Sequence, residues 1–305
     1  MSSRRFVGWK ASILPAIAAA VTTAAMLPTA ANAATSGTVW SIVKSPNVTT
    51  GTFASNDLAS VSAVSDTDVW AAGFDNKTGV SSSGDSPLIE HWNGTAWSVA
   101  PNVPRQVSDS NNLLAVTAVS ADDIWAVGEF DQGGTSPESQ LLMHWDGTSW
   151  SLSKEAVINT GESNAFPVAV TAVSSTDVWA VGGVGVTGQD GSTSQQPFSE
   201  HWDGTQWTEV ETPAPATISA SFAFTAAAAV SKNDVWAVGL NAARSFIEHW
   251  NGSTWSAAGL PALGTEGNAL EGIVKSGPSS LWAVGDNSPK SSLIEQSLTL
   301  HTTQG

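Results

Sequence analysis

The sequence predicts an all-β protein, a five-bladed β-propeller built from four-stranded blades. A unit of about 50 residues recurs along the chain, which is the period of propeller blades. Two tryptophan-centred motifs recur, the first in five units and the second in four. The second motif contains an Asn-Gly or Asp-Gly pair, and such pairs mark tight β-hairpins.

The first motif reads Ser-x-x-Asp-Val-Trp-Ala-Val-Gly and predicts the second strand of each unit. Its five copies have their tryptophans 55, 54, 57 and 46 residues apart, and the fifth copy carries Ser280 in place of the Asp. The tryptophans are Trp70, Trp125, Trp179, Trp236 and Trp282.

The second motif, His-Trp-Asn/Asp-Gly-x-x-Trp, predicts the hairpin between the third and fourth strands. It occurs at residues 91–97, 144–150, 201–207 and 249–255. Of the 15 tryptophans, 14 lie at repeat positions, and Trp9 is the exception. The first strand of each unit is a run of small alternating residues, as in 58–64. The mature chain shows no helical periodicity, which excludes a helical solenoid.

The two ends of the chain predict how the ring closes. The fifth unit has Leu293-Ile294-Glu295, with Gln296 and Ser297 where His and Trp are expected. Residues 36–41 match residues 93–98 and would supply the missing outer strand, which removes an open sheet edge. We therefore expect one propeller domain over 34–305 and a monomer. Exchange of this strand between subunits is the alternative.

Residues 1–33 are predicted to be a signal peptide. A basic start with Arg4, Arg5 and Lys10 precedes an apolar run over 13–27, and Ala31-Asn32-Ala33 forms a cleavage site. The rival interpretation is a membrane anchor, which Pro15 and the cleavage pattern disfavour. General secretion and twin-arginine export both remain open. We expect a secreted protein with no membrane insertion after cleavage.

Composition excludes several classes of function. The chain has no Cys and no Tyr, which removes disulfides, thiolate metal sites and phenol chemistry. Its 27 acidic and 11 basic residues give a net charge of −16. Nucleic-acid binding depends on Lys and Arg at phosphates, so we expect no nucleic-acid partner.

The repeats over 174–182 and 248–252 resemble those of secreted bacterial propeller proteins and are loosely kelch-like. The resemblance covers essentially the whole mature chain and concerns the fold. Kelch-like folds include galactose oxidase, whose copper radical needs Tyr and Cys, so that activity is excluded. Sialidase propellers use a Tyr nucleophile and three arginines, and Arg105 and Arg244 are the only arginines after the signal. Some secreted five-bladed propellers are lectins.

Loop lengths predict where a ligand would bind. The turns after the first and third strands are short and uniform, whereas the other connections are long and variable and would share the opposite face. Variable loops on a rigid scaffold carry most binding sites. Polar residues recur there before each first strand, either to bind sugar hydroxyls or to form Asx turns that start the strand. The candidate ligand-binding residues are Asn56, Asp57, Asn111, Asn112, Glu162, Asn164, Glu266 and Asn268.

The recurring His, Asp and Trp are expected to be structural. Equivalent histidines on different blades are too far apart to share one zinc ion, so we predict no metal site and no cofactor. The Asp of the first motif is expected to accept backbone N–H bonds in its turn. The tryptophans of the first motif are expected to pack between blades, and those that open the fourth strands to be partly exposed. Lys275 either points into the channel or is an exposed residue of the degenerate fifth repeat. We favour the exposed position.

These observations favour a non-catalytic, lectin-like module that recognises glycans or cell-surface polysaccharide through the long-loop face, with no catalytic residue. Repeated sites would give multivalency. One alternative is a glycan-cleaving enzyme that uses carboxylates at the funnel, with Asp57, Glu162, Glu266 and Glu271 as candidates. Another alternative is a scaffold for a protein partner.

Overall fold

The computed structural model describes residues 40–48, 54–76, 84–107, 110–131, 138–159, 162–187, 193–213, 222–241, 244–263, 267–278, 280–287 and 296–303. The chain divides between Val43 and Lys44, and every described strand lies in the unit Lys44–Gly305. The predicted signal peptide lies outside the described residues. In the described part of the chain, no helix is long and apolar enough to cross a membrane.

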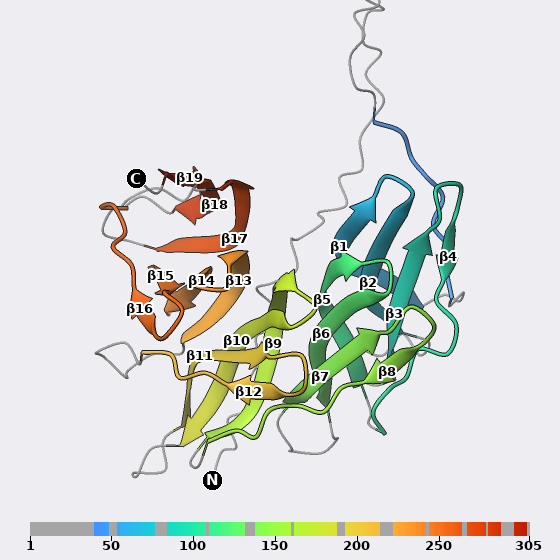
Figure 1. Cartoon of the computed structure of the whole chain (residues 1–305), viewed down its shortest axis with the longest axis horizontal. Coiled ribbons are helices and arrows are strands. Elements are labelled where there is room, and N and C mark those ends of the chain that lie inside the picture. Colours follow the sequence, from blue (N-terminus) through green and yellow to red (C-terminus); the bar gives the residue numbers. More distant parts are fainter. Residues whose placement is uncertain are drawn as a thin grey trace, which may run out of the picture. The chain divides into compact units, whose positions relative to one another are not determined.

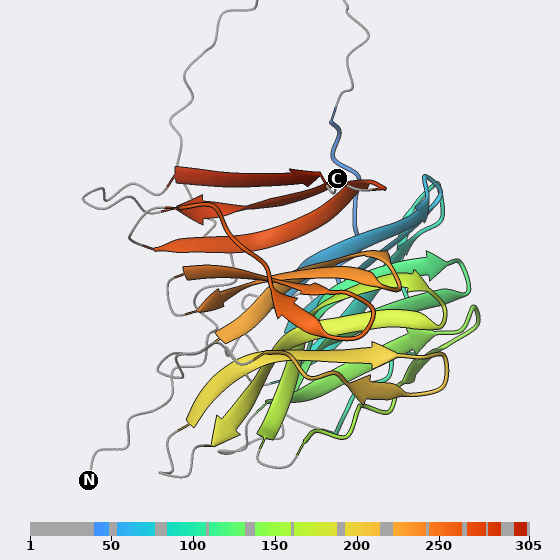
Figure 2. The same ribbon diagram turned by 60° about the vertical axis from the view of Figure 1, so that its left-hand side comes forward.

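Five antiparallel sheets follow one another along the chain, and each lies beside the next in both views (Figures 1 and 2). The first contains β1 (Ser55–Ser65), β2 (Asp68–Asn76), β3 (Asp85–Trp92) and β4 (Trp97–Val99). The second contains β5 (Ser110–Ser120), β6 (Asp123–Asp131), β7 (Glu138–Trp145) and β8 (Trp150–Leu152). The third contains β9 (Glu162–Ser174), β10 (Asp177–Thr187), β11 (Thr193–Trp202) and β12 (Trp207–Glu209).

The fourth sheet contains β13 (Phe222–Ser231), β14 (Asp234–Asn241), β15 (Arg244–Trp250) and β16 (Trp255–Ala257). The fifth contains β17 (Asn268–Gly277), β18 (Ser280–Asn287) and β19 (Gln296–Thr303). The predicted fold, an all-β five-bladed propeller, is confirmed, and the fifth blade has three strands within the described residues. Residues 36–39 lie outside that part of the chain, so their pairing with the last blade stays a prediction.

The predicted alignment of the fifth blade is wrong by five residues. His301 of β19, not Gln296, lies opposite Trp282, as His91 lies opposite Trp70 in the first blade. The two rings stack with centroids 4.2 Å apart, and Ser280 Oγ lies 2.9 Å from His301 Nε2. The alignment through Leu293-Ile294-Glu295 was wrong because the register of this strand is set by its pairing with β18, which the local sequence does not reveal.

The innermost strands of neighbouring blades contact each other and exchange hydrogen bonds. The backbone N–H groups of Val116 and Ala118 donate to the hydroxyls of Ser60 and Ser62, at 3.1 and 3.0 Å. Ala229 N donates to Thr171 Oγ1 at 3.1 Å in the same way. Small hydroxyl residues on the first strand therefore join one blade to the next.

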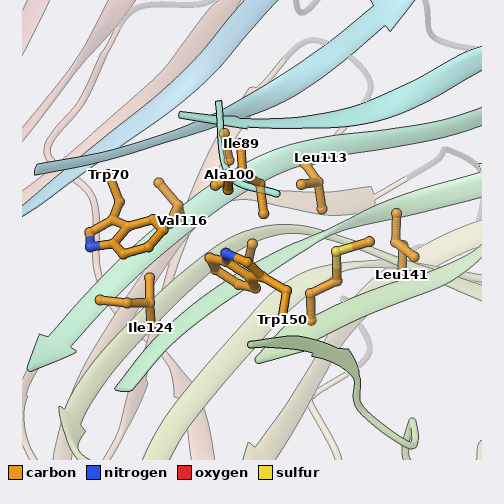
Figure 3. Close-up of a cluster of buried hydrophobic side chains, with 11 residues drawn as sticks. Trp70, Ile89, Ala100, Leu113, Val116, Ile124, Leu141 and Trp150 are labelled. Carbon is orange, nitrogen blue, oxygen red and sulfur yellow. The ribbon is translucent and has the colours of Figure 1, made fainter. Parts of the chain in front are cut away.

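The hydrophobic core lies between blades rather than within one sheet. In the cluster of Figure 3, Trp70 and Ile89 of the first blade meet Leu113, Val116 and other residues of the second. Equivalent clusters join the second blade to the third, the third to the fourth and the fourth to the fifth. Burial of these apolar faces is the main force that holds successive blades together.

The tryptophans that open the fourth strands are also part of this core, so the prediction that they are partly exposed is wrong for three of them. Trp150, Trp207 and Trp255 are each about 5% exposed. Each packs edge-on against the first-motif tryptophan of the preceding blade, with centroids 5.2–5.6 Å apart. A fourth strand of three residues is enough to carry this side chain into the junction.

Candidate functional site

The short turns gather on one rim, as the loop lengths predict. Gly94 has a φ of +90°, which a glycine adopts without strain, and a Cβ built there would lie 2.9 Å from the Thr67 Cβ. Gly147, Gly204 and Gly252 meet the corresponding turn of their own blades in the same way. The turn after the first strand thus packs on the turn after the third.

The first four blades each carry a His–Asp–Trp unit beside this rim, and Ser280 takes the place of the Asp in the fifth. In the first blade, Asp68 Oδ1 accepts hydrogen bonds from Trp70 Nε1 at 3.0 Å and pairs with His91 Nε2 at 2.8 Å. The His91 and Trp70 rings stack with centroids 4.1 Å apart. The Asp therefore joins two side chains instead of accepting the backbone bonds predicted for it. The other pairs are His144–Asp123, His201–Asp177 and His249–Asp234, all at 2.9 Å.

An open pocket of about 300 Å³ lies at the rim between the first two blades, with Asp68, His91 and Trp145 in its wall. Its polar side chains bond within the protein, since Trp145 Nε1 donates to Ala121 O at 3.1 Å and His91 pairs with Asp68. These groups recur in several blades, so the pocket is a by-product of blade packing.

Three of the eight candidate ligand-binding residues use their amide oxygens to hold backbone. Asn56 Oδ1 accepts from Val48 N at 2.9 Å, and Asn111 Oδ1 accepts from Gln106 N at 2.8 Å. Asn268 Oδ1 accepts from Ser245 N of the preceding blade at 2.8 Å. These contacts are structural, but none is the Asx turn weighed above, because each donor lies at least five residues away in sequence.

The other five candidates have different surroundings. Asp57 is exposed on β1, and Asn112 is buried with no hydrogen-bond partner for its Oδ1 among the described residues. Asn164 has a φ of +62°, the left-handed conformation that Asn tolerates. Glu162 is described for its backbone alone, and Glu266 lies outside the described residues. The eight residues lie on different blades, and their role in ligand binding stays a prediction.

Lys275 of β17 lies on the surface and donates from Nζ to Val230 O of the fourth blade at 3.0 Å. The favoured interpretation, an exposed residue, is confirmed, with this added contact to the neighbouring blade. Lys275 thus fixes the fifth blade to the fourth instead of facing a carboxylate.

Buried glutamates in the third strands are a feature that the sequence analysis missed. Glu90, Glu200 and Glu248 occupy the same register position and are almost fully buried, while Met143 and Leu300 occupy it in the other two blades. Burial raises the pKa of Glu200 and of Glu248 to about 8. The apolar Met143 and Leu300 at the same repeat position indicate that this position is buried.

Glu271 breaks the repeat on the innermost strand of the fifth blade. Each first strand has a bulge at the same repeat position. The residues left unpaired there are Ala59, Leu114, Val168, Thr225 and Glu271. Glu271 alone of these is charged. Partial burial, together with the nearby Asp286 carboxylate, raises the pKa of Glu271. The Thr225 hydroxyl donates to Leu270 O at 2.6 Å and holds the backbone just before it.

The chain matches no protein-family model and no curated protein. Among solved structures it resembles the GH93 α-L-arabinofuranosidase of Fusarium graminearum bound to arabinobiose, with 11% identity, 77% of this chain and 72% of that chain covered, and a TM-score of 0.49. An α-L-arabinanase of Penicillium chrysogenum, also with arabinobiose, has 9% identity, coverage of 73% and 67%, and a TM-score of 0.46. YCF48 bound to D1 peptide has 12% identity, coverage of 79% and 80%, and a TM-score of 0.41.

Resemblance at this level concerns the fold, but it corrects the favoured prediction of function. That prediction, a non-catalytic lectin-like module, was drawn by analogy from the architecture. The glycan-acting proteins named here are an arabinofuranosidase and an arabinanase and not lectins, which contradicts the lectin-like prediction and the preference against an enzyme. The alternative of glycan cleavage must be judged on the residues of this chain.

Proposed function

We propose that this protein is a glycan-cleaving enzyme in which Glu271 is the general acid. One observation carries the proposal: at five equivalent bulge positions, a carboxylic acid occurs once, and its pKa is raised. Cleavage needs a single asymmetric site, and Glu271 supplies the asymmetry that the repeats otherwise lack. A raised pKa favours the protonated form of this acid, which is the form that glycosidic-bond cleavage requires.

In this proposal the Glu271 carboxyl donates its proton to the glycosidic oxygen as the bond to the leaving sugar breaks. Asp286, which lies on the neighbouring strand β18, is the partner carboxylate that stabilises positive charge at the sugar carbon or activates the attacking group. The bulge supports this role because it leaves Glu271 outside the ladder of hydrogen bonds between β17 and β18.

The wider setting is part of the same proposal. The chain would be exported by the signal over 1–33 and would act outside the cell on a polysaccharide. Its acidic surface would favour neutral over acidic glycans because like charges repel. The kelch-like character of the repeats is also part of the proposal. It rests on the repeat motifs of the sequence.

The test measures release of reducing sugar from a panel of polysaccharides, including arabinose-containing ones, by the purified chain. We expect release by the natural protein and a loss of about 100-fold or more in kcat for Glu271→Gln, the typical effect of removing a general acid. Asp286→Asn should lower kcat as well. Glu155→Gln is the matched control, because Glu155 also has a pKa raised by burial but lies on the connection after β8.

The pH profile adds a second criterion. Activity should fall as pH rises through the raised pKa of Glu271, because the deprotonated acid cannot supply a proton. Absence of release from every glycan, or full activity in Glu271→Gln, would overturn the proposal.

A further inference from the structure

The buried glutamates of the third strands face the preceding blade, and two of them allow a direct comparison. Glu200 meets the second blade, where it accepts a hydrogen bond from Ala156 N at 3.3 Å. The Gln140 amide, oriented with its nitrogen toward the carboxyl, donates to both Glu200 oxygens at 2.8 and 3.2 Å. Glu200 is therefore buried with donors on each oxygen, although Glu155 and Glu209 lie near enough to disfavour its charge.

Glu248 occupies the same position one blade later and has lost both donors. The residue that corresponds to Gln140 is Pro197, which lies opposite Gly183 as Gln140 lies opposite Glu129. The residue that corresponds to Ala156 is Pro213, six residues after the tryptophan of the fourth strand in each case. Proline has no N–H to donate. Glu248 Oε2 accordingly has no hydrogen-bond partner within the described part of the chain.

Among the described residues, no charge compensates the Glu248 carboxyl. Its pKa is raised to about 8 by burial alone, with no contribution from a neighbouring charge. Asp234 and His249 of its own sheet bond to each other, and Lys275 of the fifth sheet bonds to Val230 O. The titratable groups on the elements around it are Asp234, Arg244, His249, Asp177, Glu200, His201, Glu209, Glu211, Glu271, Lys275 and Asp286.

We propose that the junction between the third and fourth blades is a proton-dependent joint, closed while Glu248 is a neutral carboxylic acid and loosened when that group ionises. A charged carboxylate with 2% exposure, whose Oε2 has no donor among the described residues, must regain water, and in this proposal it does so by separation of the blades. The pKa of Glu200 is also raised to about 8, but the junction between the second and third blades should respond less, because the Gln140 amide and Ala156 N can donate to an ionised Glu200. This inference is independent of the proposed enzymatic activity.

The direction of the effect follows from linkage. The folded protein keeps the Glu248 proton up to about pH 8, whereas the unfolded chain releases it near pH 4.5. The stabilising effect of protonation is complete below the unfolded pKa and is lost as pH rises through the folded one. Over that window the equilibrium constant for opening should rise by up to about 1,000-fold from this residue.

The experiment is hydrogen exchange of backbone amides at pH 6 and pH 9, corrected for intrinsic exchange rates. In the natural protein we expect protection of β13–β16 to fall at least tenfold more than protection of β5–β8. The second blade is the internal reference because Met143 occupies the equivalent position. Equal pH dependence of the two blades would overturn the proposal.

Two variants make the test specific. Glu248→Met copies the second blade and Glu248→Gln keeps the shape of the side chain, and either should abolish the extra loss of protection at pH 9. Glu90→Gln is the matched control, since Glu90 is buried at the same position but accepts a hydrogen bond from Ser45 Oγ at 2.6 Å. This substitution should leave the protection of β13–β16 unchanged. A pH response that persists in a folded Glu248 variant would show that another group is responsible. If neither variant folds, the comparison of blades in the natural protein decides alone.

Discussion

The same repeat positions are buried at the junction between the first and second blades and exposed elsewhere. The exposed copies lie on the outward faces of the first and last blades. Trp70 is 3% exposed, whereas its equivalent Trp282 in the fifth blade is 40% exposed. Leu113 is fully buried against the first blade, whereas its equivalent Leu58 is 44% exposed. The residues are alike, so the difference lies in the neighbour. Each blade has two apolar faces, and a blade that lacks a neighbour on one side leaves one uncovered.

This comparison shows why a ring suits the repeat. The uncovered faces of the first and fifth blades carry the residue types that bury each other at the other junctions, so closing the ring would cover both. The predicted outer strand over 36–41 would add Trp40 to the last blade. In the structure, Trp40 is 95% exposed.

The largest loss of stability is expected at a buried junction between two blades. Trp179→Ala should lower the free energy of unfolding by about 3–5 kcal/mol, because it leaves a cavity beside Trp255 and removes the ring contact with His201. Urea unfolding followed by circular dichroism measures it. A loss below about 1 kcal/mol would contradict the view that the junctions carry the core.

The next effect tests ring closure. If the ring is closed in solution, Trp282→Ala should cost about 2–4 kcal/mol and Trp40→Ala a similar amount, whereas exposed side chains would cost about 1 kcal/mol or less. We expect the larger losses, together with a monomer by size exclusion. Losses near zero for both variants would contradict closure, and a dimer would instead indicate exchange of the 36–41 strand.

The smallest effect concerns the His–Asp–Trp units. Asp177→Ala leaves Trp179 Nε1 and His201 Nε2 without their acceptor and should cost about 1–2 kcal/mol. Ser280→Ala removes the weaker, exposed counterpart in the fifth blade and should cost less than about 1 kcal/mol. Thermal unfolding compares the two. An equal or larger loss for Ser280→Ala would contradict the idea that burial decides the strength of the unit.

Much of the fold could be predicted from local patterns. The Asn-Gly and Asp-Gly hairpins, the five Val-Trp-Ala or related strands and the short-turn rim depend on residues close in sequence. The strand that contains His301 was misplaced because its register depends on Trp282 and Ser280, which lie on another strand. Trp150, Trp207 and Trp255 were misjudged because their burial comes from the preceding blade.

The candidate site was less predictable than the fold. Asn56, Asn111 and Asn268 were named for their recurrence, but their backbone acceptor roles appear only when the connecting segments are in place. Glu271 was a minor candidate, and its bulge position and its proximity to Asp286 are properties of the β17–β18 pair.

The sequence by itself determined the repeat, the strands, the tight turns and the number of blades, because periodicity and turn chemistry act over a few residues. Only the tertiary structure decided which tryptophans are buried and which glutamates keep a proton. The contrast between Glu200 and Glu248 shows the physical reason. Both follow the same motif, but the donors on one and the prolines beside the other come from the neighbouring blade. The environment of a side chain in a propeller is set by the blade it faces.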